Sequence, residues 1–355
     1  MSGPQALPSG GGRDWSELAI ELLAWAVRPA CAVERRADDE PLRLPMLRER
    51  GIDSLWVFAH GVDDPVQRVY DKVWREQLRL AAEFDAAMRS ERIPCLALKG
   101  LPLAARWFGG RALGCMGDID VLVPREDILR TIAVLYALGL RPRYFDADAG
   151  RMRDRDIAEM AAAEARHYEL VAYNRCVALE LDDEELAAAR SLKRNSLRMI
   201  DGRPVAIVEL DVHHGVASDL DSGEFFERAV APATGMRTLS DADHLWFGLS
   251  RLYAEVALHG KDSLRDFAYL APLVTRGEVD WRVVVDAAAR LELRPALFYF
   301  LGFVQHLAGG AIPAGVLDEL DPRKGLRYRD WGWQVGRLLG RLDPSPAFVG
   351  EGARG

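Results

Sequence analysis

Cysteine is scarce in this chain, and none of it is spaced for binding a metal. The four cysteines form no Cys-x-x-Cys pair and lie far apart, at Cys31, Cys95, Cys115 and Cys176. This spacing argues against a zinc site and against a disulfide framework, and it suits small buried side chains in a reducing cytoplasm. The motif His-Glu-x-x-His is also absent, so the sequence offers no catalytic zinc site.

Long hydrophobic runs are missing as well. The longest, around residues 243–260, is interrupted by Arg251 and Glu255 and is unsuited to spanning a bilayer. Residues 1–14 are polar and rich in glycine and proline, without an apolar signal segment, which predicts a disordered tail. We therefore expect a cytoplasmic protein with no membrane partner.

The chain has no excess of positive charge. It carries 46 Lys and Arg against 54 Asp and Glu, for a net charge of -8. This balance argues against a partner that is long nucleic acid, because such binding depends on neutralising many phosphates. The pair Gly109 and Gly110 belongs to no Rossmann or P-loop fingerprint. With 49% hydrophobic residues, the chain is able to bury a substantial core.

Hydrophobic periodicity is what the sequence does contain, and it separates helical ends from a mixed centre. Apolar residues recur at helical spacing over 14–27, over 66–93 and in four stretches after residue 240. Short apolar runs predict strands at 94–100, 118–123, 140–146, 167–173, 176–181 and 204–215, and we expect a helix within 146–166. The fold class expected is α+β, a mixed sheet with flanking helices inside a largely helical protein. The expected divisions are a tail at 1–14, a helical region at 15–92, a core at 93–235, a helical region at 236–345 and a tail at 346–355.

Two carboxylates stand at the head of a predicted buried strand, in the stretch "MGDIDVLVP". Because side chains alternate along a strand, Asp118 and Asp120 should project from the same face, about 6.5 to 7 Å apart at the backbone. Their repulsion is unfavourable unless a positive charge lies between them. Mg²⁺ prefers oxygen ligands of this kind together with substrate phosphates.

A third carboxylate would allow two ions to bridge one phosphate and stabilise both the attacking and the leaving oxygen. The stretch "VELDVHHG" offers Asp211 on the polar face of another predicted strand, with Glu209 as the fallback. An Asp-x-Asp pair alone is a weak signal, because aspartates at strand ends also cap loops and helices. From this pattern alone, a structural role and a metal-binding role both stay open.

The surrounding motifs change that balance. "LALKG", "RALGCMGDIDVLV" and "VELDVHHG" together resemble the bacterial uncharacterised nucleotidyltransferase family of the DNA polymerase β-like superfamily. The resemblance covers most of the chain, and the Lys-Gly and Asp-x-Asp motifs are its specific part. It implies a polymerase β-like nucleotidyltransferase core.

The resemblance also implies roles for individual residues. Asp118, Asp120 and Asp211 would bind Mg²⁺ or Mn²⁺ and act in catalysis. The nucleotide would be bound by Lys99, Gly100 and Arg111. His213, two residues after Asp211, would either orient that carboxylate or face the nucleotide. A structural or solvated side chain is the competing interpretation of Lys99, Arg111 and His213, and the favoured one of His167, His214 and His259. His60, His244 and His306 have no partner at metal-ligand spacing.

One feature departs from the wider superfamily pattern, which has serine or glycine after the first glycine and about a dozen residues before the aspartates. Here Leu101 follows Gly100, and residues 101–117 intervene. The missing hydroxyl removes one contact to the phosphates.

The function expected is transfer of an NMP, AMP in the first instance, from an NTP to a hydroxyl or amine of an unidentified small-molecule, peptide or protein acceptor. One alternative is a non-catalytic nucleotide-binding or antitoxin-like regulatory protein. A weaker one is a metal-dependent phosphohydrolase, which would release phosphate without an acceptor.

Overall fold

The computed structural model describes residues 14–37, 39–164, 167–192, 195–215, 222–232, 235–322 and 333–340. The two predicted tails lie outside the described residues, apart from Asp14. Asp14 caps the first helix, α1 (Trp15–Val27), by accepting a hydrogen bond from the backbone of Ser16, and Glu17 completes a capping box. The helix predicted at 14–27 is therefore confirmed.

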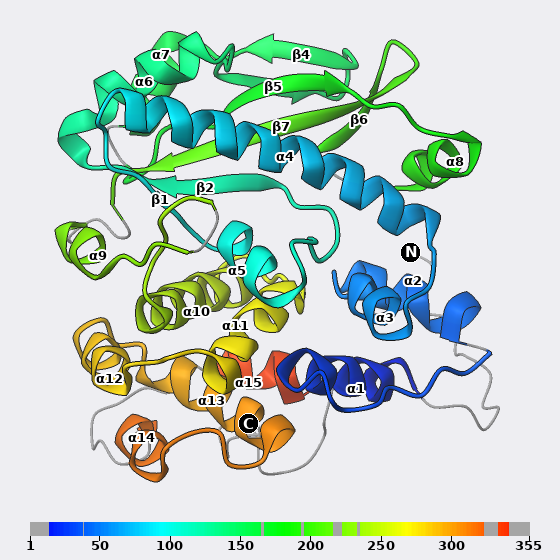
Figure 1. Cartoon of the computed structure of the whole chain (residues 1–355), viewed down its shortest axis with the longest axis vertical. Coiled ribbons are helices and arrows are strands. Elements are labelled where there is room, and N and C mark those ends of the chain that lie inside the picture. Colours follow the sequence, from blue (N-terminus) through cyan, green and yellow to red (C-terminus); the bar gives the residue numbers. More distant parts are fainter. Residues whose placement is uncertain are drawn as a thin grey trace.

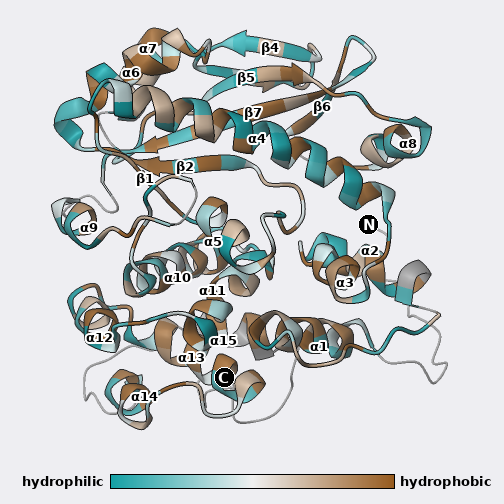
Figure 2. Ribbon diagram, in the orientation of Figure 1, coloured by the Kyte–Doolittle hydropathy of each residue, from teal (hydrophilic) through white to brown (hydrophobic). Residues whose placement is uncertain are grey.

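Three short elements and one long helix complete the N-terminal part. The short elements are a π-helical turn at Asp39–Arg43, α2 (Leu44–Glu49) and α3 (Asp53–His60). The long helix is α4 (Pro65–Ser90), which begins where Asp64 accepts a hydrogen bond from the backbone of Gln67. Figure 2 shows α4 alternating between hydrophobic and hydrophilic residues, as a helix with one buried face does.

A five-stranded mixed sheet forms the centre of the molecule (Figure 1). Its strands are β1 (Leu96–Ala97), β2 (Asp118–Leu122), β5 (Tyr173–Ala178), β6 (Leu197–Ile200) and β7 (Arg203–His213). β1 pairs with β2 antiparallel, and β2 pairs with β7 in parallel. β5 runs antiparallel along one edge of β7. The other edge of β7 pairs with two strands: β6 pairs antiparallel with residues 203–206, and β2 pairs in parallel with residues 209–213.

The parallel pairing of β2 and β7 requires a long connection across the sheet. This connection contains a 3-10 turn (Arg125–Asp127), α6 (Ile128–Ala137), the hairpin β3 (Arg143–Asp146) and β4 (Arg151–Asp154), α7 (Ile157–Glu164), β5, α8 (Asp183–Ser191) and β6. The short helix α5 (Gly100–Trp107) lies between β1 and β2 in the chain.

Several sequence predictions in this region need correction. Residues 167–173 form no strand before Tyr173, because only an isolated bridge joins Glu169 to His213. The stretch 146–166, predicted as a helix, contains strand β4 before the short helix α7. β6 was not predicted, since four residues are too few to show a period against the long strand that they flank.

The two faces of the sheet differ in chemistry. Ile119, Val121, Leu210 and Val212 are fully buried in the main core, together with the apolar residues of α4. Because side chains alternate along each strand, Asp118, Asp120 and Asp211 project from the opposite face. α4 thus covers the apolar face and leaves the other for polar groups.

The C-terminal part of the chain returns to helices, as the sequence predicts. They are α9 (Gly223–Arg228), α10 (Asp241–Ala257), α11 (Arg265–Arg276), α12 (Trp281–Arg290), α13 (Arg294–Ala308), α14 (Ala314–Leu320) and α15 (Trp333–Gly340). A second apolar cluster joins α10 to the sheet through Trp246 and Phe247, which lie with Leu98 and Leu122.

The α+β class, a mixed sheet with flanking helices, is confirmed. The domain boundaries at 92/93 and 235/236 stay a prediction, and the main apolar core runs across both. In the described part of the chain, no helix combines the length and the hydrophobicity needed to cross a membrane.

Candidate active site

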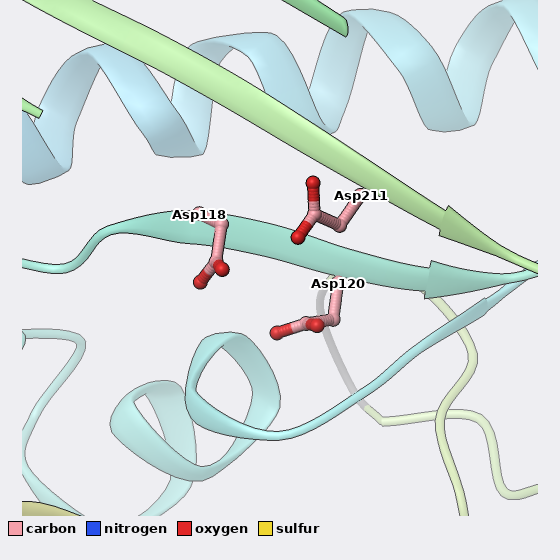
Figure 3. A group of neighbouring side chains, drawn as sticks. All are labelled: Asp118, Asp120 and Asp211. Atoms are coloured by element: carbon pink, nitrogen blue, oxygen red, sulfur yellow. The ribbon is translucent and has the colours of Figure 1, made fainter. Parts of the chain in front are cut away.

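Three aspartates from two neighbouring strands converge on the polar face of the sheet. The parallel register places Asp118 beside Glu209 and Asp120 beside Asp211. One carboxylate oxygen from each of Asp118, Asp120 and Asp211 lies within 4.8 Å of the others. Figure 3 shows their side chains pointing to the same side of β2 and β7, with a long helix behind the strands.

Asp120 is held by two partners on the same oxygen. Lys99 donates a hydrogen bond and forms an ion pair with Asp120 Oδ1, and His213 Nε2 lies 3.0 Å from that oxygen. Asp120 is only 4% exposed and His213 only 1%. Burial raises the pKa of the Asp120 carboxyl, but the charges and hydrogen bonds of Lys99 and His213 outweigh burial and hold that pKa well below its usual range. Lys99 and His213 therefore favour the ionised form of Asp120.

The backbone at Lys99 adopts a conformation that L-residues rarely populate, with φ 52° and ψ −127°. Such a conformation costs about 1–3 kcal/mol and persists only where the surroundings enforce it. The strained residue is the one whose ammonium meets Asp120, at the turn between β1 and α5. Strain at a charged residue of this kind is typical of a functional site.

The pKa values of Asp118 and Asp211 are shifted upward, opposite to the pKa of Asp120. The charge of Asp120 and burial raise the pKa of Asp118. Burial, followed by the charges of Asp118 and Asp120, raises the pKa of Asp211 to about 9. Burial and Asp118 raise the pKa of Glu209 to about 7. The protein thus crowds four carboxyl groups together with too little positive charge of its own to ionise them all.

A divalent cation fits this arrangement. Asp211 Oδ1 is buried and has no hydrogen-bond partner, although most buried polar atoms in proteins have one. Oxygen donors alone, three of them carboxylates, form the set that Mg²⁺ and Mn²⁺ prefer. A cation bound among Asp118, Asp120 and Asp211 would give the unpaired oxygen of Asp211 a ligand partner. It would also lower the raised pKa values of Asp118 and Asp211.

Gly100, the first residue of α5, packs against Met116. A Cβ placed there would lie 2.5 Å from Cε of Met116 and 3.7 Å from the ring of Tyr269. The nearest atom is the end of a flexible side chain, which can shift, so this contact alone does not require glycine. Contact between this backbone and a phosphate stays a prediction.

Arg111 lies apart from the three aspartates in its contacts. Its Nη2 donates to Asp71 Oδ2 of α4 at 2.7 Å, and its guanidinium lies over the ring of Phe58, 4.3 Å from the centroid. A role for Arg111 in nucleotide binding stays a prediction, and it would require this ion pair to open.

His213 has neighbours beyond Asp120, although its Nδ1 makes no hydrogen bond. Glu169 Oε2 lies 3.4 Å from its Nδ1, and the ring of Tyr168 stacks on its ring, with 6.1 Å between centroids and 23° between planes. His213 thus connects Asp120 to the segment before β5. His214 does not belong to this group. Burial, and then the charge of Arg125, lower the pKa of its ring.

Two arginines near the aspartates were not among the residues predicted from sequence. Arg251 of α10 donates from Nη1 to the hydroxyl of Tyr168 at 2.6 Å. Arg265 of α11 donates from Nη1 to the carbonyl of Cys115, three residues before Asp118, at 3.1 Å. The only local signal was that Arg251 interrupts an apolar helical run.

A cavity of about 1000 Å³ lies beside α4, α5 and the start of α10. Its lining includes Ala97, Leu101, Met236 and His244. Ala97 pairs with Val121, so it shares the α4 side of the sheet, opposite the aspartates. Asp118, Asp120 and Asp211 are not among the residues that line this cavity.

The class of protein follows from these features. A mixed sheet with flanking helices, carrying Asp-x-Asp on one strand and a third aspartate on its parallel neighbour, is consistent with a polymerase β-like core. The chain belongs to the family described as uncharacterised nucleotidyltransferase, whose model matches residues 67–309, well over half of the chain. No curated protein and no solved structure matches the sequence.

Family membership confirms the resemblance seen in the sequence at the level of the family. It supports nucleotidyl transfer as the general activity and a nucleotide as one substrate. The matched span includes β1, α5, β2 and β7, and so contains Lys99 and all three aspartates.

Proposed function

We propose that this protein is a metal-dependent nucleotidyltransferase of the polymerase β-like superfamily. It transfers an NMP, with AMP the first candidate, from an NTP to a hydroxyl or amine of a small-molecule, peptide or protein acceptor. The observation that carries the proposal is the in-register placement of Asp118, Asp120 and Asp211 on two parallel strands, with the orphaned oxygen of Asp211 among them.

Asp118, Asp120 and Asp211 would hold Mg²⁺ or Mn²⁺. When bound, the metal supplies positive charge that stabilises the attacking and leaving oxygens of an in-line phosphoryl displacement. In that reaction the acceptor atom bonds to the α-phosphorus, the bond from the α-phosphorus to its bridging oxygen breaks, and pyrophosphate leaves.

The residues of the chain have separable roles in this reaction. Asp120 keeps its charge because Lys99 and His213 hold it. Asp211, less tightly held, is the carboxylate placed to accept the proton of the acceptor. Lys99 is the nearest cation to the row of acids and adds charge that favours an electron-rich transferring group.

The test is release of labelled pyrophosphate from NTP in native cell extract, with Asp118→Asn and Asp120→Asn compared to the wild type. We expect either change to lower release at least about 100-fold. Asp286→Asn, an exposed carboxylate on α12, is the control and should leave release unchanged. Release that survives both changes would reject the mechanism.

The same experiment identifies the acceptor and tests the rival function. Mass spectrometry of the extract after incubation with labelled ATP should show a component that gains the mass of one nucleotide. Stabilisation of the protein by ATP and Mg²⁺ without pyrophosphate release, across a broad screen of acceptors, would instead support a non-catalytic nucleotide-binding protein. Release of phosphate with no acceptor would support a phosphohydrolase.

A further inference from the structure

Two helices from the C-terminal part of the chain each bring one arginine to the group of aspartates. α10 carries Arg251 and α11 carries Arg265, and Figure 1 places both helices beneath the strands β1 and β2, beside α5. The two guanidinium groups approach by different routes, one through the segment before β5 and one through the loop before β2.

Arg265 approaches the Asp118 end of the site. Its Nη1 donates to the carbonyl of Cys115 at 3.1 Å, which places the guanidinium beside the loop that leads into β2. Its closest carboxylate, Asp266, is at the limit of an ion pair, with 3.9 Å between Nε and Oδ1. Asp120 and burial raise the pKa of Asp118, and Lys99 and Arg265 oppose that shift, as expected for charges close in space.

Arg251 approaches the Asp120 end. Its Nη1 donates to the Tyr168 hydroxyl at 2.6 Å, the Tyr168 ring stacks on His213, and His213 lies 3.0 Å from Asp120. Within the described residues, no carboxylate lies within 4.0 Å of the Arg251 guanidinium, so its hydrogen-bonding partner is a neutral hydroxyl. Among the described residues, the Arg251 guanidinium therefore has no ion-pair partner, although it lies near the three aspartates.

Arg228 and Arg106 show how this protein pairs an arginine with a nearby carboxylate. Arg228 donates from two nitrogens to Asp243, at 2.8 and 2.9 Å, and Arg106 donates from Nη2 to Asp241 at 2.9 Å. Arg251 and Arg265 lack such bidentate partners, and a phosphate group is the anion that a guanidinium fork matches best after a carboxylate. Lys99, by contrast, is already engaged by Asp120.

We propose that Arg251 and Arg265 bind the β- and γ-phosphates of the NTP, so that the C-terminal helices complete the nucleotide site. This inference rests on the proposed function, since it assigns the phosphates of the same substrate. It places the main cationic contacts of the leaving group more than 150 residues after the Lys-Gly turn. The two arginines would also replace the contact to the phosphates that is lost because Leu101, rather than serine, follows Gly100.

The test measures binding rather than turnover. Isothermal titration with inorganic tripolyphosphate in Mg²⁺, and with Mg²⁺ alone, is done on the full chain as wild type, Arg251→Met and Arg265→Met. Each variant should bind tripolyphosphate at least about tenfold more weakly than the wild type. Each should bind Mg²⁺ alone as tightly or more tightly, because a cation next to the carboxylates has been removed. Arg282→Met, exposed on α12, is the matched control.

If the arginines had a purely structural role, their substitution would weaken the binding of both ligands equally. Equal losses of affinity for tripolyphosphate and Mg²⁺ would therefore overturn the proposal. Unchanged tripolyphosphate affinity would overturn it as well. Arg265→Lys and Arg251→Lys should each recover part of the lost affinity, because the charge returns without the fork. Arginine-dependent tripolyphosphate binding by a protein that releases no pyrophosphate would reject the proposed reaction and leave this inference standing. Pyrophosphate release by a protein whose tripolyphosphate binding does not depend on Arg251 or Arg265 would support the proposed reaction and reject this inference.

Discussion

Asp120 and Asp211 occupy paired positions on β2 and β7, yet their surroundings act on their charges in opposite directions. Lys99 and His213 share one oxygen of Asp120 and keep it ionised, whereas Asp211 has one buried oxygen without a partner. Placing Lys99 and His213 beside only one member of the pair leaves room for an external cation beside the other. The asymmetry is a property of individual side chains rather than of the sheet.

The first prediction concerns Asp211 and the stability of the metal-free protein. Burial and neighbouring acids raise its pKa to about 9, far above the value of about 4 in an unfolded chain. The folded state therefore binds a proton that the unfolded state releases, and stability falls as pH rises between these two values. In EDTA at pH 8, Asp211→Asn should increase the free energy of unfolding by about 1 kcal/mol or more, measured by urea denaturation.

At pH 5 the same substitution should have a smaller effect, because pH 5 lies close to the pKa of this carboxyl in the unfolded chain, so little free energy is spent on keeping it protonated in the folded state. Asp286→Asn, on the exposed face of α12, should be neutral at both pH values. A loss of stability at pH 8 in Asp211→Asn would show that the carboxylate has a favourable partner instead.

At the scale of elements, the connection from β1 to α5 is the most constrained part of the site. Two residues of β1 pair with β2, the chain turns through the strained Lys99, and α5 starts at once with Gly100 packed on Met116. β2 then begins directly after the loop that contains Met116. Each of these short elements determines the position of the next, so an error in one displaces the Lys99 ammonium.

The second prediction tests this packing. Gly100→Ala should lower the free energy of unfolding by at most about 1 kcal/mol, because the new Cβ meets only the movable end of the Met116 side chain. Adding Met116→Ala removes the obstructing atoms, and the double variant should lose less than the sum of the two single changes. A double-mutant cycle by chemical denaturation measures this coupling.

Additivity in that cycle would show that Met116 moves aside without cost. If the single Gly100→Ala variant keeps its stability but binds tripolyphosphate poorly, the glycine is required for approach of the phosphate, as the sequence motif implies.

At the scale of the whole molecule, the site depends on both ends of the fold. α4 covers the apolar face of the sheet, and α10 packs on the opposite side through Trp246 and Phe247. The acids thus lie between a sheet stabilised from behind and helices that approach from the C-terminal part. Any cation that binds the acids should therefore stabilise the global fold.

The third prediction is a pH-dependent response of the protein to Mg²⁺. Metal binding must displace the protons that the raised pKa values of Asp118 and Asp211 retain, so metal affinity rises with pH. The increase in melting temperature caused by Mg²⁺ should be larger at pH 8 than at pH 6, measured by thermal denaturation, and EDTA should abolish it. Asp211→Asn should lose most of it. An equal shift at both pH values would show that the metal does not replace these protons.

The sequence could predict the parts of this protein that repeat at a local period. The alternation in "DIDVLV" and "VELDVHHG" placed Asp118, Asp120 and Asp211 on strand faces, and the apolar stripes after residue 240 predicted the helices α10 to α13. Short elements escaped it, such as β6 and β4, because four residues show no period of their own. The segment 167–173 was misread as a strand because its apolar residues pack without forming a ladder.

By itself, the sequence determined which residues are acidic at alternate positions, which helices have an apolar face and which family the chain resembles. These are properties of neighbouring residues, set by the pitch of a helix or the pleat of a strand. Only the tertiary structure decided that Asp118 pairs with Glu209 and Asp120 with Asp211, that Lys99 is held in a strained turn, and that Arg251 and Arg265 reach the acids while Arg111 pairs with Asp71. Such contacts join residues far apart along the chain, and their geometry follows from how the sheet and helices pack rather than from any local pattern.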